Sequence, residues 1–206
     1  MAFSIDWLGW SRGAKSSELA LETLESYRER YRPIARLAGM AREFDAAGPL
    51  DIVEDKVGTG STDFWGISFS PCSTEQEPMD EAELERGIKL LRACWTFFDG
   101  VAARVSPQMR KGPRGGGRDR DQIIGHTVRV ESEGFARSVG LRIPEGAAST
   151  PDGLRRYRKD YVAAMRAYNA GKVEPRMRSG TLAYLIRHSA FHTLDHAWEM
   201  EDKDLS

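Results

Sequence analysis

Apolar residues recur at alternating intervals of four and three in the segment that begins near Met79. The repeat runs for three heptads, through Leu84, Ile88, Leu91, Trp95, Phe98, Ala102 and Val105. Such a repeat places one apolar stripe along a helix that packs against other helices. Asp80 can cap this helix, with Glu83 three residues later. The pattern predicts a long bundle helix that starts after residue 79.

Three further segments show helical periodicity. The second helix is expected over about Asp119–Gly140, the third from Pro151 and the last within Thr181–Lys203. Their predicted inward positions are, in order, Ile123, His126 or Thr127, Val130, Gly134 and Arg137 or Ser138; Leu154, Tyr157, Tyr161, Met165 and Tyr168; and Leu182, Leu185, Ser189, His192, His196 and Glu199. Four such helices joined by loops of moderate length predict an up-down four-helix bundle over residues 76–206.

The first 75 residues have a different pattern. A helix is expected over Lys15–Leu37, with Ser16 or Ser17 as its N-cap. The segments Leu50–Val57 and Asp63–Phe69 alternate between apolar and polar residues on either side of a glycine-rich turn, which predicts a β-hairpin. The expected fold class is therefore α+β and mainly α, with a small N-terminal α/β segment (residues 1–75) before the bundle.

Within the predicted helix over Lys15–Leu37, Pro33 is a site where a kink or an early end is expected.

Composition and charge narrow the class of protein. The chain has 206 residues, of which 40% are hydrophobic and 30% charged, as in an ordinary globular protein. A formal net charge of -1 gives no overall attraction to nucleic acid or to an anionic membrane, and no apolar run is long enough to span a bilayer. With two cysteines, Cys72 and Cys94, and no signal peptide, we expect a reduced, cytoplasmic protein with no nucleic-acid or membrane partner.

Three of the four histidines lie in the last predicted helix, at His188, His192 and His196. Residues four apart share one helix face, so two of these imidazoles can ligate one metal ion. His192 and His196 continue the inward positions, whereas His188 lies at their edge. His126 lies on or beside the inward face of the second helix, and the bundle can bring it to the pair.

Three imidazoles with an open fourth position are typical of catalytic zinc sites. Nickel, cobalt, iron and copper also suit imidazole. The alternative interpretation is a histidine-bearing helix face that holds no ion. Four nearby acids, Glu131, Glu133, Asp195 and Glu199, can orient the imidazoles or be solvated charges, and the second interpretation is favoured for Glu133 and Asp195.

The most basic part of the chain precedes the second helix. Arg110, Lys111, Arg114, Arg118 and Arg120 surround the glycines at 115–117. This segment can form an anion-binding rim over the metal, or a loop with solvated charges, and the latter is favoured.

In these features the chain resembles the DinB-like metal-binding four-helix bundles over residues 79–206. That family has one histidine on the second helix and an HxxxH pair on the fourth, positions that His126, His192 and His196 match. The resemblance implies one divalent metal ion, zinc or nickel, and a homodimer. Some members are thiol S-transferases or isomerases that use mycothiol or bacillithiol. Many relatives carry Arg-Gly-Gln after the last histidine, whereas this chain has Ala197–Glu201 there, so shared substrate or dimer contacts are in doubt.

The N-terminal segment resembles the HicB-like α/β fold, although the Pro-Gly-Cys turn of that fold is absent at Trp7–Trp10. The expected function is a metal-dependent thiol S-transferase or hydrolase that acts on a small molecule or thiol. The alternative is a non-catalytic metal-binding module for dimerisation or partner binding.

Overall fold

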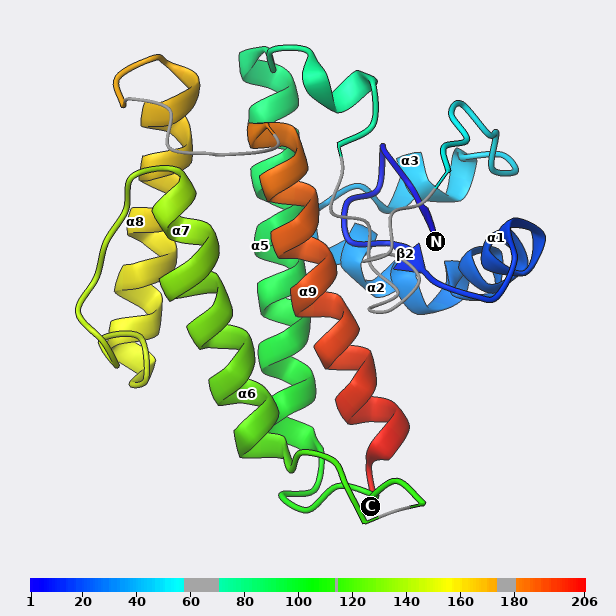
Figure 1. Cartoon of the computed structure of the whole chain (residues 1–206), viewed down its shortest axis with the longest axis vertical. Coiled ribbons are helices and arrows are strands. Elements are labelled where there is room, and N and C mark those ends of the chain that lie inside the picture. The colour runs from blue at the N-terminus through cyan, green and yellow to red at the C-terminus, as the bar shows by residue number, and fades with distance from the viewer. Residues whose placement is uncertain (58–70, 114, 174–180) are drawn as a thin grey trace. The chain divides into compact units, whose positions relative to one another are not determined.

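The computed structural model describes residues 1–57, 71–113, 115–173 and 181–206 (Figure 1). It is mainly helical with one small two-stranded sheet, which confirms the expected mainly-α α+β class. The chain forms two compact units. Unit 1 comprises residues 1–97 and 179–191, and unit 2 comprises residues 98–178 and 192–206. The predicted domain division between residues 75 and 76 stays a prediction.

Unit 1 begins with a short hairpin. Strands β1 (Ala2–Phe3) and β2 (Ser11–Arg12) pair antiparallel, with Phe3 opposite Ser11. The turn between them closes through a hydrogen bond from the Trp10 N–H to the Trp7 carbonyl, 3.1 Å long. This turn brings both tryptophan rings to the same side of the hairpin, where they join the core of unit 1.

Aromatic side chains form that core. Trp10 stacks on Tyr31 at 5.6 Å between ring centroids, and Trp7 meets Phe44 edge-to-face at 4.9 Å. The polar ends of the buried rings are satisfied: Tyr31 donates its O–H to the Leu8 carbonyl at 2.9 Å. Edge-to-face and offset contacts of this kind are the favoured geometries for aromatic pairs.

The predicted helix over Lys15–Leu37 is two helices. Helix α1 (Ser17–Ser26) begins at Ser16, whose hydroxyl accepts the Leu19 N–H as expected of an N-cap. The break falls at Tyr27, not at Pro33, which lies inside α2 (Arg28–Leu37). The indole N–H of Trp10 donates to the Leu24 carbonyl at 2.7 Å, and this bond satisfies a carbonyl in the last turn of α1. Helix α3 (Ala41–Ala46) follows.

The predicted β-hairpin after α3 is wrong in its first arm. Residues 50–57 have no strand, and Ile52, Val53 and Val57 are exposed. Local polar contacts hold this segment, since Glu54 accepts the Ser73 N–H at 2.7 Å. The second arm, residues 63–69, lies outside the described residues.

Helix α5 (Glu81–Arg104) follows the short 3₁₀-helix η1 (Thr74–Gln76). Its start is the predicted cap: the Glu83 N–H donates to Asp80 Oδ1 and the Asp80 N–H to Glu83 Oε2, each at 2.8 Å. The heptad positions are buried as expected, with the exception of the partly buried Ala102. The predicted bundle helix is confirmed.

Unit 2 contains the end of α5 and the remaining helices. These are α6 (Arg120–Arg129), the π-helix η2 (Val130–Phe135), α7 (Ala136–Ser138), α8 (Pro151–Asn169) and the part of α9 (Leu182–Lys203) from residue 192. Asp99 of α5 pairs with Arg158 of α8 at 2.5 Å, and Arg104 of α5 pairs with Glu201 of α9. Tyr157 of α8 meets Glu131 of η2. Four helical segments therefore surround one core in unit 2.

The directions of these helices differ from the expected up-down order. Tyr157 meets Glu131, and Val173 packs against Gly140, where an added Cβ would lie 2.8 Å from the valine Cγ1. Segment α6–α7 and helix α8 therefore run in the same direction, as the colours in Figure 1 show. Residues 139–150 make this possible, because about a dozen extended residues reach roughly 40 Å and the 19-residue α8 is only about 28 Å long.

The π-helix η2 shifts the inward face of the second helix. Ile123 and Thr127 are buried before it, as expected, but the predicted positions Gly134 and Arg137 are exposed. Glu131, Ser132, Ala136 and Val139 are buried instead. A π turn carries one more residue than an α turn, so later inward positions fall one residue or more further along. The last helical residue is Ser138 and the C-cap is Val139, one residue before the predicted C-cap Gly140, which has a positive φ of +82°.

Candidate metal centre

Three imidazoles converge in unit 2. His126 comes from α6, and His192 and His196 come from successive turns of α9. The ring centroid of His126 lies 5.3 Å from that of His192 and 5.0 Å from that of His196, and the centroids of the two α9 rings are 4.6 Å apart. One nitrogen from each ring lies within 4.8 Å of the others. The three side chains could thus hold one metal ion, and the sequence prediction that they lie together is confirmed.

The cluster is more open on one side than on the other. His196 is 7% exposed, whereas His126 and His192 are only partly buried. The edge of the Phe135 ring faces His192 at 5.6 Å between centroids and forms an apolar wall there. Three nitrogen donors with partial solvent access fit a metal that keeps one exchangeable position.

A carboxylate orients the most buried imidazole. Glu199, one turn after His196 on α9, lies with Oε2 2.7 Å from His196 Nδ1. An ionised carboxylate can only accept, so Nδ1 carries the proton and donates. The Nε2 lone pair of His196 is then the one available to a metal, and a carboxylate behind a ligating histidine makes that nitrogen a better donor.

The charges of the site keep His126 neutral and Glu199 ionised. Burial, with Arg118 and other cationic groups nearby, lowers the pKa of His126 to about 4. The hydrogen bond from His196, together with Lys203, lowers the pKa of Glu199 to about 2 despite partial burial. A neutral imidazole is the form that ligates metal, so His126 can act as a donor at neutral pH.

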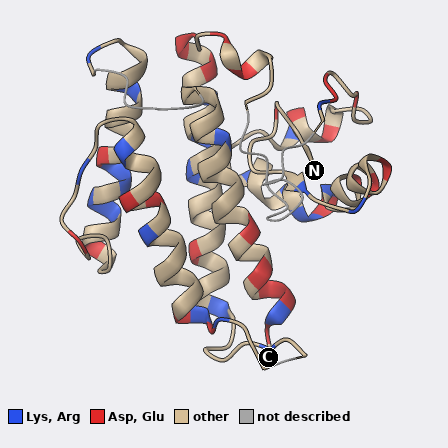
Figure 2. Cartoon of the chain, viewed as in Figure 1, with Lys and Arg blue, Asp and Glu red and all other residues tan. Residues whose placement is uncertain are grey.

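The Lys and Arg residues before α6, coloured blue in Figure 2, largely contact other groups of the protein. Lys111 pairs with Asp119 at 2.6 Å, and Arg110 donates to the Asp202 carbonyl at 2.6 Å. Arg118 reaches the site itself, 3.3 Å from Glu199 Oε2. Of the residues considered for an anion-binding rim, Arg118 is the one that the described structure places at the histidines; Arg114 lies outside the described residues.

His188 is not part of the cluster. It lies in unit 1, 92% buried, with its Nδ1 2.9 Å from the Tyr184 hydroxyl. Burial, with Arg187 beside it, lowers its pKa to about 4. Arg187 in turn forms a buried two-point ion pair with Glu75. The neighbourhood of His188 is therefore a structural polar cluster.

Two of the acids near the site, Glu199 and Glu131, have different partners. Glu199 contacts an imidazole, as predicted. Glu131 is buried and lies beside Tyr157, whose pKa it raises together with burial. Two residues at the site were not predicted from the sequence: Phe135, and Lys203, which contacts the other oxygen of Glu199 at 2.6 Å. The four-residue spacing from Glu199 to Lys203 on a helix is typical of such an ion pair and could have predicted it.

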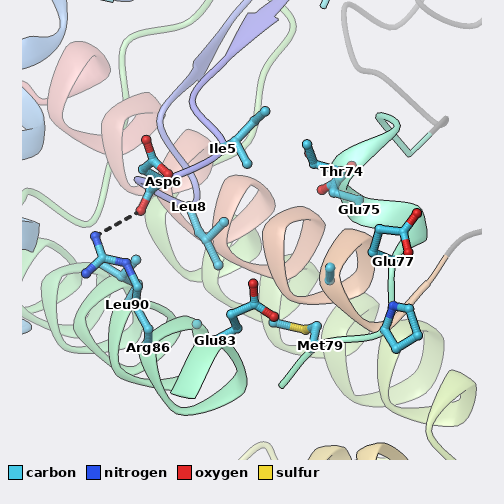
Figure 3. Close-up of a pocket in the computed structure, with 13 residues that line it drawn as sticks. Ile5, Asp6, Leu8, Thr74, Glu75, Glu77, Met79, Glu83, Arg86 and Leu90 are labelled. Atoms are coloured by element: carbon cyan, nitrogen blue, oxygen red, sulfur yellow. Dashed lines mark hydrogen bonds between the residues drawn. The ribbon is translucent and has the colours of Figure 1, made fainter. Parts of the chain in front are cut away.

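Unit 1 contains a separate cavity of about 160 Å³ beside the start of α5 (Figure 3). Three of its charged lining residues have partners within the protein. Glu83 caps α5, Glu75 pairs with Arg187, and Arg86 pairs with Glu43 at 2.7 Å. The cavity therefore offers an apolar hollow without converging reactive groups, and the histidine cluster is the stronger candidate site.

Comparison with known proteins gives no relative: no family model, no curated protein and no solved structure matches the chain. Among the described residues, no helix combines the length and apolarity needed to cross a bilayer.

Proposed function

We propose that the protein binds one divalent metal ion through His126, His192 and His196, as a DinB-like four-helix bundle, and uses it in catalysis. The single observation that carries the proposal is the convergence of three imidazole nitrogens within 4.8 Å from two helices. Neutral imidazoles gathered on a helix bundle need partners for their lone pairs, and a metal ion satisfies all three together.

The proposed reaction is the transfer of a group to or from a low-molecular-weight thiol, or a hydrolysis. A bound zinc or nickel ion would lower the pKa of a coordinated thiol or water and so supply a nucleophile at neutral pH. The chain's own contribution lies in its side chains. Glu199 fixes the tautomer and orientation of His196, Phe135 shields His192 from water, and the partly exposed His126 leaves a path for the substrate.

Elemental analysis of the purified, untagged protein tests the site. We expect about one zinc or nickel ion per chain in the parent and none in His192→Ala or His126→Ala. His188→Gln is the matched control, since it removes a histidine one turn earlier on the same helix and should keep the metal. Absence of metal from the parent, even after incubation with zinc and nickel, would contradict the proposal.

The second candidate is a non-catalytic module in which an ion only ties helices together. The positions of the ligands on two helices favour this structural role, because an ion held by His126 and His192 would cross-link α6 to α9. Thermal unfolding of His126→Ala separates the two. A catalytic centre loses metal with a small change in melting temperature, whereas a structural centre loses metal and stability together.

Two further expectations accompany the proposal. The resemblance implies a homodimer, which light scattering on the eluting protein tests directly. The sequence favours a cytoplasmic, reduced setting, in which Cys72 and Cys94 stay thiols; both thiols are buried in the structure.

A further inference from the structure

Arg118 is a cation at the edge of the proposed metal centre. Its guanidinium contacts Oε2 of Glu199, the same oxygen that accepts the hydrogen bond from His196. The side chain is 37% exposed, and in the described parts of the chain this 3.3 Å contact is the hydrogen bond that we find for it. A guanidinium has five N–H donors in a planar fork, so this one contact leaves other donors of Arg118 available to a ligand.

Glu199 does not neutralise the cations around it. One carboxylate faces two of them, Lys203 at 2.6 Å and Arg118 at 3.3 Å. The longer contact is the weaker one, because hydrogen bonds between charged groups are normally 2.7–2.9 Å long. Arg129 adds a further positive charge near His126. With a divalent ion present, the local charge is strongly positive and favours an anion.

The backbone on both sides of Arg118 has a defined conformation. Gly117 has φ of +132°, a conformation that residues with a Cβ rarely adopt. The glycine turn is closed by the Gly112 N–H, which donates to the Gly116 carbonyl at 2.8 Å. Asp119, next along the chain, caps α6 and accepts from Lys111. Arg118 therefore lies between Gly117 and the capped start of α6, while its head group stays accessible.

We infer that the ligand of the metal centre carries an oxyanion group, and that Arg118 binds this group while another atom of the ligand occupies the open metal position. This inference rests on the proposed metal site and names its ligand class: a small thiol, or a related metal-binding molecule, with a carboxylate or another oxyanion a few bonds away. The incoming oxyanion exchanges with the long contact to Glu199. Glu199 keeps its bonds to His196 and Lys203, so the metal centre stays intact.

Cobalt-loaded protein gives a test that needs no enzymatic activity. Thiolate binding to Co²⁺ produces a charge-transfer absorption, which can be titrated with simple thiols. The probes are 3-mercaptopropionate, with a carboxylate, 2-mercaptoethanesulfonate, with a tetrahedral oxyanion, and 2-mercaptoethanol, with no charge. Cobalt retained after ultrafiltration is measured in each sample, so removal of the metal by the thiol is detected.

We expect the better of the two anionic thiols to bind the parent about tenfold or more tighter than 2-mercaptoethanol, the gain typical of a charged hydrogen bond. Which of the two anionic thiols binds more tightly shows whether the site prefers a planar carboxylate or a tetrahedral oxyanion. Arg118→Ala should remove this preference and leave 2-mercaptoethanol binding and cobalt content unchanged, and Arg118→Lys should restore part of it. Arg129→Ala, the control for net charge, should weaken both anionic thiols slightly and keep the preference.

Three results overturn the inference in distinguishable ways. Equal affinity of the parent for charged and uncharged thiols shows that there is no oxyanion site. A preference that persists in Arg118→Ala places that site elsewhere. Failure of the parent to hold cobalt removes the metal site itself, and with it both the proposed function and this inference.

Discussion

Replacing Glu199 measures what a carboxylate behind His196 contributes to the proposed metal centre. The carboxylate accepts the Nδ1–H of His196 at 2.7 Å and stays ionised, because its pKa is near 2. Removing such a partner of a ligating histidine typically weakens metal binding tenfold to a hundredfold. Two cations, Lys203 and Arg118, already offset part of the charge of Glu199, so the electrostatic share of this effect is reduced.

Two variants divide the effect into its parts. Glu199→Gln keeps an oxygen that can accept from His196 and loses only the charge, so we expect zinc affinity to fall by about tenfold, or about 1.4 kcal/mol. Glu199→Ala loses the hydrogen bond as well and should approach a hundredfold loss, about 2.7 kcal/mol. Zinc affinity is measured by competition with a chromophoric chelator at pH 7.

Glu201→Gln is the matched control. It removes the same charge two residues later on α9, where Glu201 pairs with Arg104. Its zinc affinity should equal that of the parent. Removing an acid near the C-terminus of a helix also relieves an unfavourable interaction with the helix dipole. Substitutions at Glu199 or Glu201 should therefore leave α9 folded. Zinc affinity in Glu199→Ala within twofold of the parent would refute the role assigned to the carboxylate.

Further predictions concern unit 1. The pKa of His188 is about 4 in the folded chain against about 6.5 unfolded, so its contribution to stability is complete above pH 6.5 and is lost as the pH falls to 4. As the pH falls from 6.5 to 4, the unfolding free energy measured by urea titration should drop by about 3 kcal/mol less in His188→Gln than in the parent. An equal drop in both proteins would disprove this. Glu75→Gln leaves Arg187 buried without its carboxylate and should cost about 3–5 kcal/mol, much of it recovered in a double Glu75→Leu, Arg187→Met variant; a loss below about 1 kcal/mol would contradict this. Trp10→Phe removes the hydrogen bond to the Leu24 carbonyl and should cost about 1–3 kcal/mol, and an unchanged urea midpoint would show that the bond contributes nothing.

Helix positions and the histidine cluster could be predicted because local rules determine them. The 4-3 spacing through Leu91 and Trp95 identified the buried face of α5, and Asp80 with Glu83 marked its start. His192 and His196 lie on one face simply because they are four residues apart on a helix. The same reasoning separates Glu199 from Asp195, since a residue three after His196 faces its ring.

Other features depend on interactions that periodicity does not encode. The segment containing Ile52 and Val53 alternates like a strand, yet a strand needs a paired edge, and these side chains are exposed. Next to the break at Tyr27, the Leu24 carbonyl accepts a hydrogen bond from the indole of the distant Trp10, a contact that helical periodicity does not reveal. The direction of α8 depends on the path of residues 139–150, which a count of helices leaves open. Metal ligation, the DinB-like relationship and the chemistry stay predictions.

The π-helix η2 has a consequence for comparing this chain with others. An α-helix advances about 100° per residue, so one extra residue rotates everything after it by that angle relative to everything before it. His126 can therefore face the metal site while Ala136 and Val139, beyond η2, face the core of unit 2. A relative with an uninterrupted α-helix here would need one residue fewer. An alignment without a one-residue gap between 130 and 135 would match buried positions of one chain with exposed positions of the other.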